Sequence, residues 1–143
     1  MYLKDLSFIG PFLYIVYTNC INQVIKNLGG DAVLYVDDTN VVIKRNTVQN
    51  VMDTAKHILQ AIINVYGSLN LDINWDKTSY MIFSNDTVID SNLTVNGNVI
   101  NQVQVTDFLG VKIDQKLNWS FQFNAILISL NRNLFLLRQC AQI

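Results

Sequence analysis

Hydrophobic residues recur at intervals of three and four along three stretches of the chain, and this spacing predicts helices. The expected helices cover residues 11–28, 47–67 and 119–141. Between them the hydrophobic positions form shorter runs, rich in β-branched and aromatic residues, which are typical of strands.

The ends and the buried faces of the first two helices can also be predicted. Pro11 suits the first position of a helix, and Gly29 and Gly30 are expected to end it. Thr47 can cap the second helix, because its hydroxyl can accept a hydrogen bond from a free N–H of the first turn. The stripes expected to be buried are Leu13, Val16, Tyr17, Cys20, Val24 and Leu28 in the first helix, and Val48, Val51, Met52, Ala55, Leu59, Ile62, Ile63 and Tyr66 in the second.

Two hairpins are expected. Strand-like runs at 32–36 and 41–44 flank the polar stretch 37–40, which is expected to form the turn. A second hairpin is expected over 92–100, because Asn96-Gly97 tolerates the positive φ angles of a type I′ turn.

Single strands are expected at 79–84 and at 106–113. Gly110 lies inside the second of these and indicates a bulge or a close approach of another backbone. The resulting order of helix, hairpin, helix, strand, hairpin, strand and helix predicts an α+β fold with a mainly antiparallel sheet.

Composition and charge exclude several classes of protein. Half of the 143 residues are hydrophobic, which excludes a disordered chain and leaves room for one domain with a sizeable core but little room for two. The net charge of −1 excludes a strongly basic surface that would bind phosphates by charge alone. The apolar run 8–17 is shorter than the roughly 20 residues that span a bilayer and lacks the features of a secretory signal, so no membrane segment and no secretion are expected. Cys20 and Cys140 are expected to be buried, reduced thiols.

The clearest candidate for chemistry is the acidic pair Asp37-Asp38, which follows the apolar run ending at Val36. Adjacent carboxylates repel one another unless cations bind, and a purely structural turn more often contains Asp-Gly or Asn-Gly. Hard divalent cations such as Mg²⁺ take oxygen ligands from one or two protein carboxylates and from substrate phosphates. The pair is therefore a candidate metal site, and two solvated turn carboxylates without a function are the alternative.

Four blocks in the chain resemble, in the same order, segments of reverse transcriptases of non-LTR retrotransposons of the LINE type, jockey-like in particular. Residues 34–43 resemble the hairpin of the third catalytic motif (motif C), which has the pattern Tyr-x-Asp-Asp. Residues 9–17 resemble the helix that follows motif B, and residues 71–83 resemble the motif D region. Residues 108–119 resemble the primer grip and the entry to the thumb.

The resemblance implies a partial polymerase palm over 1–114 and the start of the thumb over 115–143, with the catalytic type of hairpin flanked by helices. It implies that Asp37 and Asp38 are catalytic ligands of two Mg²⁺ or Mn²⁺ ions, and that Lys77 can protonate the departing pyrophosphate. A solvated loop lysine is the alternative for Lys77.

For the primer, the resemblance implies contacts from Tyr35 and from the grip residues Phe108, Leu109 and Gly110. A missing Cβ at Gly110 would let a nucleic-acid backbone approach closely. Core tyrosine and core strand residues are the alternatives for Tyr35, Phe108 and Leu109. The implied partners are an RNA or DNA template-primer and deoxynucleoside triphosphates, and the implied location is the nucleus or the cytoplasm.

The chain also departs from the family's pattern. No segment matches motif A: Asp5 and Asp31 are the only carboxylates before the acidic pair, and neither matches the third metal ligand. Residues 4–6 replace the Pro-Gln-Gly of motif B, the fingers have no counterpart, and Gln122 stands where family members often have histidine. We therefore expect a fragment or remnant of the enzyme that does not polymerise on its own.

Two other interpretations remain at this stage. The hairpin could expose an apolar edge that self-associates or pairs with a strand of another chain, which would make the protein a non-catalytic interaction module. An unrelated metal-binding domain with accidental matches is the third interpretation.

Overall fold

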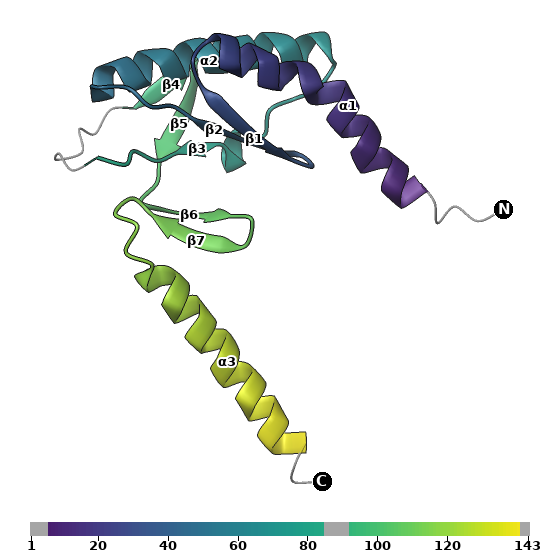
Figure 1. Ribbon diagram of the computed structural model, residues 1–143, viewed down its shortest axis with the longest axis vertical. Coiled ribbons are helices and arrows are strands. Elements are labelled where there is room, and N and C mark those ends of the chain that lie inside the picture. The colour runs from purple at the N-terminus through teal and green to yellow at the C-terminus, as the bar shows by residue number, and fades with distance from the viewer. Residues whose placement is uncertain (1–5, 85–91, 141–143) are drawn as a thin grey trace. The chain divides into compact units, whose positions relative to one another are not determined.

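The elements of the chain are three long helices and seven short strands within residues 6–84 and 92–140, the part that the computed structural model describes (Figure 1). In order they are α1 (Leu6–Asn27), β1 (Asp31–Tyr35), β2 (Asp38–Val42), α2 (Val48–Ser68), the 3-10 helix η2 (Trp75–Lys77), β3 (Ser79–Tyr80), β4 (Leu93–Val95), β5 (Asn98–Gln102), β6 (Val105–Phe108), β7 (Val111–Asp114) and α3 (Ser120–Cys140). Helices combined with small, mostly antiparallel sheets confirm the predicted α+β class.

The contacts within the chain divide it into two compact units, where composition predicted one. The first unit contains 1–77 and 93–99, and the second contains 78–92 and 100–143. This division rests on which residues contact one another and does not define functional domains. The functional division into palm and thumb after residue 114 stays a prediction.

The hydrophobic core of the first unit lies where α1 packs against α2 and β1. Its fully packed members are Ile21 and Ile25 from α1 and Ile58, Ile62 and Tyr66 from α2. Partly buried side chains that pack against this cluster are Ala32, Val41, Ile43, Val65, Leu71 and Ile73. The cluster therefore fastens one face of the β1–β2 hairpin to both helices.

The predicted buried stripe of α1 is wrong. Val16 is 59% exposed, whereas Ile21 and Ile25 are fully buried. Apolar residues occur on more than one side of this helix, so spacing alone does not select the face that packs. Thr18 joins the buried face because its hydroxyl donates to the Tyr14 carbonyl at 2.8 Å, which satisfies its polar group.

The predicted stripe of α2 is closer to the structure. Met52, Ile62 and Tyr66 are buried as expected, and Ile58 is a buried residue that the prediction omitted. Thr47 caps the helix as predicted, with its side chain accepting from the Asn50 N–H at 3.2 Å.

The carboxyl end of α1 confirms the predicted glycine stop. Gly29 has a φ of 79°, its N–H donates to the Lys26 carbonyl, and the Gly30 N–H donates to the Ile25 carbonyl. These two bonds form a Schellman motif. The other end is a correction: α1 begins at Leu6, so Pro11 lies inside the helix. Pro11 has no N–H to donate to the carbonyl four residues earlier, so this turn of the helix lacks one backbone hydrogen bond.

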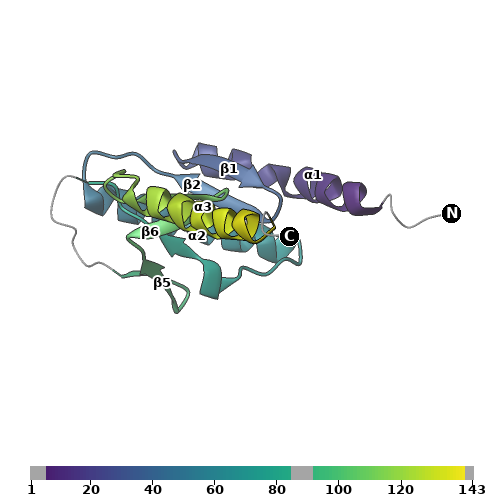
Figure 2. The same ribbon diagram turned by 90° about the horizontal axis from the view of Figure 1, so that it is seen from below.

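The β1–β2 hairpin is present, but its turn is tighter than predicted. The register pairs Tyr35 with Asp38 and Asp31 with Val42, so the turn consists of Val36 and Asp37 alone. Residues 38–40, which were expected in the turn, belong to β2. Figure 2 shows the two strands side by side.

The Asn96-Gly97 turn is confirmed. Both residues have positive φ, 50° and 81°, and β4 and β5 flank them. In the strand order β3-β5-β4, the central strand β5 pairs in parallel with β3, Ser79 opposite Asn101. The strand expected over 79–84 is limited to its first two residues.

The second unit corrects the strand expected over 106–113. That stretch is a hairpin in which β6 pairs with β7 and Phe108 lies opposite Val111. α3 follows β7 and contacts it, and no residue of α3 is buried. The two cysteines are free, as expected, but the prediction that they are buried is wrong, since both are exposed. None of the helices in the described residues is long and apolar enough to cross a membrane.

Candidate functional site

The acidic pair lies at the tip of the β1–β2 hairpin. Asp37 is the second residue of the turn and Asp38 is the first residue of β2, and both are exposed. Tyr35 is the cross-strand partner of Asp38 and is 57% exposed, so the core position considered for Tyr35 is wrong. The structure therefore brings Tyr35 and both carboxylates together at one end of a two-stranded sheet.

The backbone at this tip is strained. Val36 has a φ of 51°, in the left-handed region that β-branched residues rarely adopt. Such outliers cost roughly 1–3 kcal/mol and cluster at functional sites, where the surrounding structure maintains them. The strain lies directly before the first carboxylate.

Side-chain alternation explains why the carboxylate of Asp38 faces solvent. Val41 packs on the core cluster, and Thr39, two residues earlier, lies on the same face of β2. Asp38 therefore points to the opposite face, where it meets water. Between the described residues, no ion pair or side-chain hydrogen bond engages the carboxylate of Asp37 or Asp38.

The negative charge of Asp37 acts on a tyrosine of α1. The pKa of Tyr14 is raised to about 12, chiefly because burial disfavours the ionised phenol, then because of Tyr66 beside it, and finally because of the charge on Asp37. Tyr66 is 8% exposed and its hydroxyl lies 2.9 Å from the Thr39 hydroxyl. Sequence reasoning missed this polar connection, although the strand alternation that places Thr39 on the core face was a usable signal.

Lys77 lies at the end of η2 and is exposed. Its backbone N–H donates to the carbonyl and to the side-chain oxygen of Asn74, at 3.2 and 3.3 Å. Within 6–84 and 92–140 no ion pair links its ammonium group to the acidic pair.

The three residues expected in the primer grip lie together at the tip of the β6–β7 hairpin. Phe108 ends β6, while Leu109 and Gly110 form a two-residue turn with φ angles of 50° and 83°. Two successive positive φ angles are the mark of a type I′ turn, so Gly110 is a turn residue and not a bulge inside a strand. Leu109 and Gly110 are exposed and Phe108 is half-buried.

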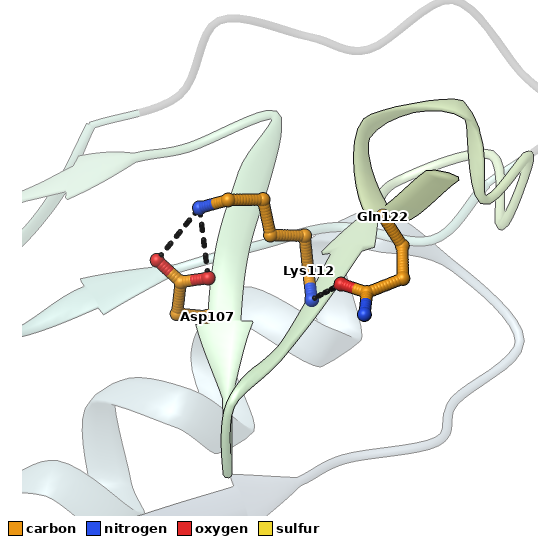
Figure 3. A network of polar contacts seen from close by, with 3 residues as sticks. All are labelled: Asp107, Lys112 and Gln122. Carbon is orange, nitrogen blue, oxygen red and sulfur yellow. Dashed lines mark hydrogen bonds and ion pairs between the residues drawn. The ribbon is translucent and has the colours of Figure 1, made fainter. Parts of the chain in front are cut away.

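A polar network joins this hairpin to α3 (Figure 3). Lys112 donates from its ammonium group to both carboxylate oxygens of Asp107, its cross-strand neighbour, at 2.9 and 3.0 Å. The Lys112 backbone N–H donates to Oε1 of Gln122 on α3 at 2.8 Å. Gln122 is thus an acceptor here, a role that the unprotonated nitrogen of a neutral histidine could also perform.

Asp114 is a further residue that sequence reasoning missed. It is 6% exposed, yet its carboxylate is satisfied by backbone N–H groups of Lys116 and Asn118 at 2.9 to 3.3 Å. A buried carboxylate with several such donors fixes the loop before α3. The loop motif Asp-Gln-Lys, with an aspartate able to bond two residues ahead, was its signal.

Comparison with known proteins identifies the family. The family model described as reverse transcriptase (RNA-dependent DNA polymerase) matches residues 7–113. The chain therefore belongs to the reverse transcriptase family, and the expectation drawn from the four blocks is confirmed.

Two curated relatives are more specific. The RNA-directed DNA polymerase from mobile element jockey of Drosophila melanogaster is 28% identical over 119 residues, which is 80% of this chain. The protein of the same description from Drosophila funebris is 26% identical over 118 residues, 79% of this chain. This chain is therefore similar to the reverse transcriptases of jockey mobile elements.

The match covers only a small part of these relatives. The chain spans 13% of the length of each. No solved structure matches the chain significantly.

Proposed function

We propose that this chain supplies the metal-binding hairpin of the palm in template-directed DNA synthesis. The observation that supports it is the placement of Asp37 and Asp38 at a strained hairpin tip, both exposed and without an ion pair to any residue of 6–84 and 92–140. RNA or DNA template-primer and deoxynucleoside triphosphates are the partners that go with this proposal.

The residues present fit a divalent cation. Mg²⁺ is usually held by one or two carboxylates together with water and substrate phosphates, and the tip offers two carboxylates open to solvent. When bound, two such ions would stabilise the attacking and leaving oxygens of nucleotidyl transfer. Asp37 and Asp38 would hold them, and Tyr35 would border the same site from the facing strand.

Further roles are proposed for residues away from the tip. Lys77, which is exposed and has no ion pair within the described residues, is available to donate a proton to departing pyrophosphate. Leu109 and Gly110 form an exposed turn beside the half-buried Phe108, and the glycine leaves room for a primer backbone. A Cβ placed on Gly110 would meet no atom within 4 Å, so the space beside it is open.

We also propose that the chain does not polymerise by itself. Two carboxylates offer two negative charges against the four positive charges of two divalent ions. Asp31, the one described carboxylate before the pair, lies at the far end of β1 from the turn, opposite Val42. Asp5 lies outside the described residues. Loss of one bridging carboxylate is expected to lower the rate on the order of 10³-fold.

A Mn²⁺ titration tests the metal site. The amide resonances of residues 36–38 are expected to broaden selectively at millimolar Mn²⁺ or below. The double variant Asp37→Asn with Asp38→Asn should abolish that broadening, and the control Asp72→Asn, an exposed acid of the same unit, should leave it intact. Selective broadening that survives the double variant would contradict the assignment.

A primer-extension assay with Mg²⁺ tests the claim of inactivity. We expect no extension product from the chain alone, and robust extension would refute it. Absence of Mn²⁺ binding in the wild-type chain would favour the other candidate, a non-catalytic module. That candidate draws support from Val33 and Val42, which are exposed on the two-stranded sheet.

A further inference from the structure

Two hydroxyl groups join α2 to the acidic hairpin. The Thr39 hydroxyl on β2 lies 2.9 Å from the Tyr66 hydroxyl on α2. The two residues come from different elements of the first unit.

The core holds one member of this pair in place. Tyr66 belongs to the core cluster, so its ring is packed among Ile21, Ile25, Ile58 and Ile62. A buried tyrosine hydroxyl needs a partner, because an unmade hydrogen bond costs roughly 1–3 kcal/mol. Thr39 is that partner.

The position of Thr39 connects the two hydroxyl groups to the acidic tip. Thr39 follows Asp38 directly in β2, so when the Thr39 side chain is held on the core face, the Asp38 side chain must project from the other face. Thr39 is also the register partner of Leu34, one pair inward from the Tyr35–Asp38 pair that closes the turn. An anchor at this pair resists the twisting of the strand end that a short two-stranded ribbon would otherwise undergo.

We propose that Thr39 and Tyr66 are positioning residues, which hold the hairpin tip so that the carboxylates of Asp37 and Asp38 present a fixed geometry to divalent cations. The inference rests on the proposed metal-binding function. It adds residues that do not touch the cation and act only through the orientation of the hairpin.

The test measures Mn²⁺ affinity of the full chain with three variants. Thr39→Val removes the hydroxyl and keeps the shape, and it should weaken Mn²⁺ binding about threefold to tenfold, the range expected from one hydrogen bond of about 0.5–1.5 kcal/mol. Thr39→Ser keeps the hydroxyl and should restore affinity to within about twofold. Ser68→Ala, which removes a hydroxyl bonded to the Val65 carbonyl at 2.7 Å at the end of α2, is the matched control and should leave affinity unchanged.

Unchanged Mn²⁺ affinity in a folded Thr39→Val chain would overturn the proposal. Equal loss in Thr39→Ser would overturn it too, because that variant retains the hydroxyl. If Thr39→Val does not fold, Tyr66→Phe replaces it, since that change removes only the other hydroxyl of the pair and should weaken binding in the same direction.

Amide hydrogen exchange of residues 36–39 separates this inference from the proposed function. If the wild-type chain binds no Mn²⁺, the proposed function fails. Faster exchange in Thr39→Val but not in Thr39→Ser would still support the bracing of the tip. Identical exchange in all three chains would overturn the positioning claim, whatever the metal does.

Discussion

At the scale of single residues, Val36 has an unfavourable backbone conformation and lies directly before the acidic pair. A β-branched residue at a φ of 51° carries a conformational cost that glycine would not have. The cost is maintained next to a pair of carboxylates, which is the setting in which strain accompanies function.

Replacing Val36 by glycine is predicted to stabilise the fold. The strain relieved exceeds the extra entropy of an unfolded glycine, so the free energy of unfolding should rise by about 0.5–1 kcal/mol. Urea denaturation measures the change. Val33→Gly, in the extended part of β1, is the control and should lower the free energy of unfolding. Destabilisation by Val36→Gly equal to that of Val33→Gly would contradict the argument.

Tyr14 makes the stability of the first unit depend on alkaline pH. Burial, Tyr66 and Asp37 raise its pKa from 10.0 to about 12 in the folded chain. A raised pKa means that the folded state holds the proton more tightly, so the stabilisation is complete below pH 10 and is lost as pH rises towards 12. Unfolding measured between pH 9 and 12 should therefore show a steeper loss of stability for the wild type than for Tyr14→Phe. Parallel curves would indicate that Tyr14 does not contribute.

At the scale of elements, two glycines show opposite requirements. A Cβ on Gly30 would lie 2.8 Å from Ile58 Cδ1 and 3.0 Å from Ile25 Cγ2, both inside the core cluster. A Cβ on Gly67, within α2, would meet nothing within 4 Å. Gly30 therefore has no space for a side chain, whereas Gly67 has space for one.

Gly30→Ala is predicted to lower the free energy of unfolding by about 1–3 kcal/mol, because two packed isoleucines must move. Gly67→Ala should raise it by about 0.5–1 kcal/mol, since alanine favours the helix. Thermal unfolding of both variants beside the wild type measures the difference. A stabilising Gly30→Ala would mean that the α1–α2 contact is looser than described.

Much at the scale of elements could be predicted from sequence, where local chemistry decides. The Thr47 cap, the glycine stop at Gly29 and the Asn96-Gly97 turn depend on neighbouring residues only, and all three are confirmed. The buried face of α1 depends on which neighbour packs against it, so spacing could not supply it. The β6–β7 turn was missed because Leu109 takes a positive φ that its residue type disfavours.

The candidate site was predicted only in part, for a similar reason. The acidic pair is visible as two adjacent letters, and resemblance assigns it a role. Thr39 and Tyr66 are separated by 27 positions in the sequence and meet only through packing of β2 and α2. Asp114 appears in sequence as a surface acid, and its burial follows from the backbone donors of its own loop.

At the scale of the whole molecule, the fold class followed from the order of elements, whereas the number of units did not. A hydrophobic content of 50% suggested one large core. A substantial share of the large apolar side chains is instead exposed on α3, including Phe123, Ile128 and Leu137. Composition counts such residues without saying what covers them. Self-association of the chain stays a prediction.

The near-neutral charge of the whole chain predicts weak binding of nucleic acid. Ten basic residues are balanced by eleven acidic ones, so few phosphate contacts can release counterions. Fluorescence anisotropy with a primer–template duplex at physiological salt should give a dissociation constant at or above about 10⁻⁴ M, with little dependence on salt. Micromolar binding with a steep salt dependence would contradict this expectation.

The two-residue turn at Val36 and Asp37 has one more consequence. Successive side chains of β2 point to opposite faces of the sheet. The length of the turn fixes the register, and so decides which residues of β2 point to which face. Deleting a single residue between Tyr35 and Thr39 would exchange the faces, sending a carboxylate toward the isoleucines and a valine into water. This bend therefore accommodates a change of residue type far more readily than a change of length, and indels here would be more damaging than substitutions.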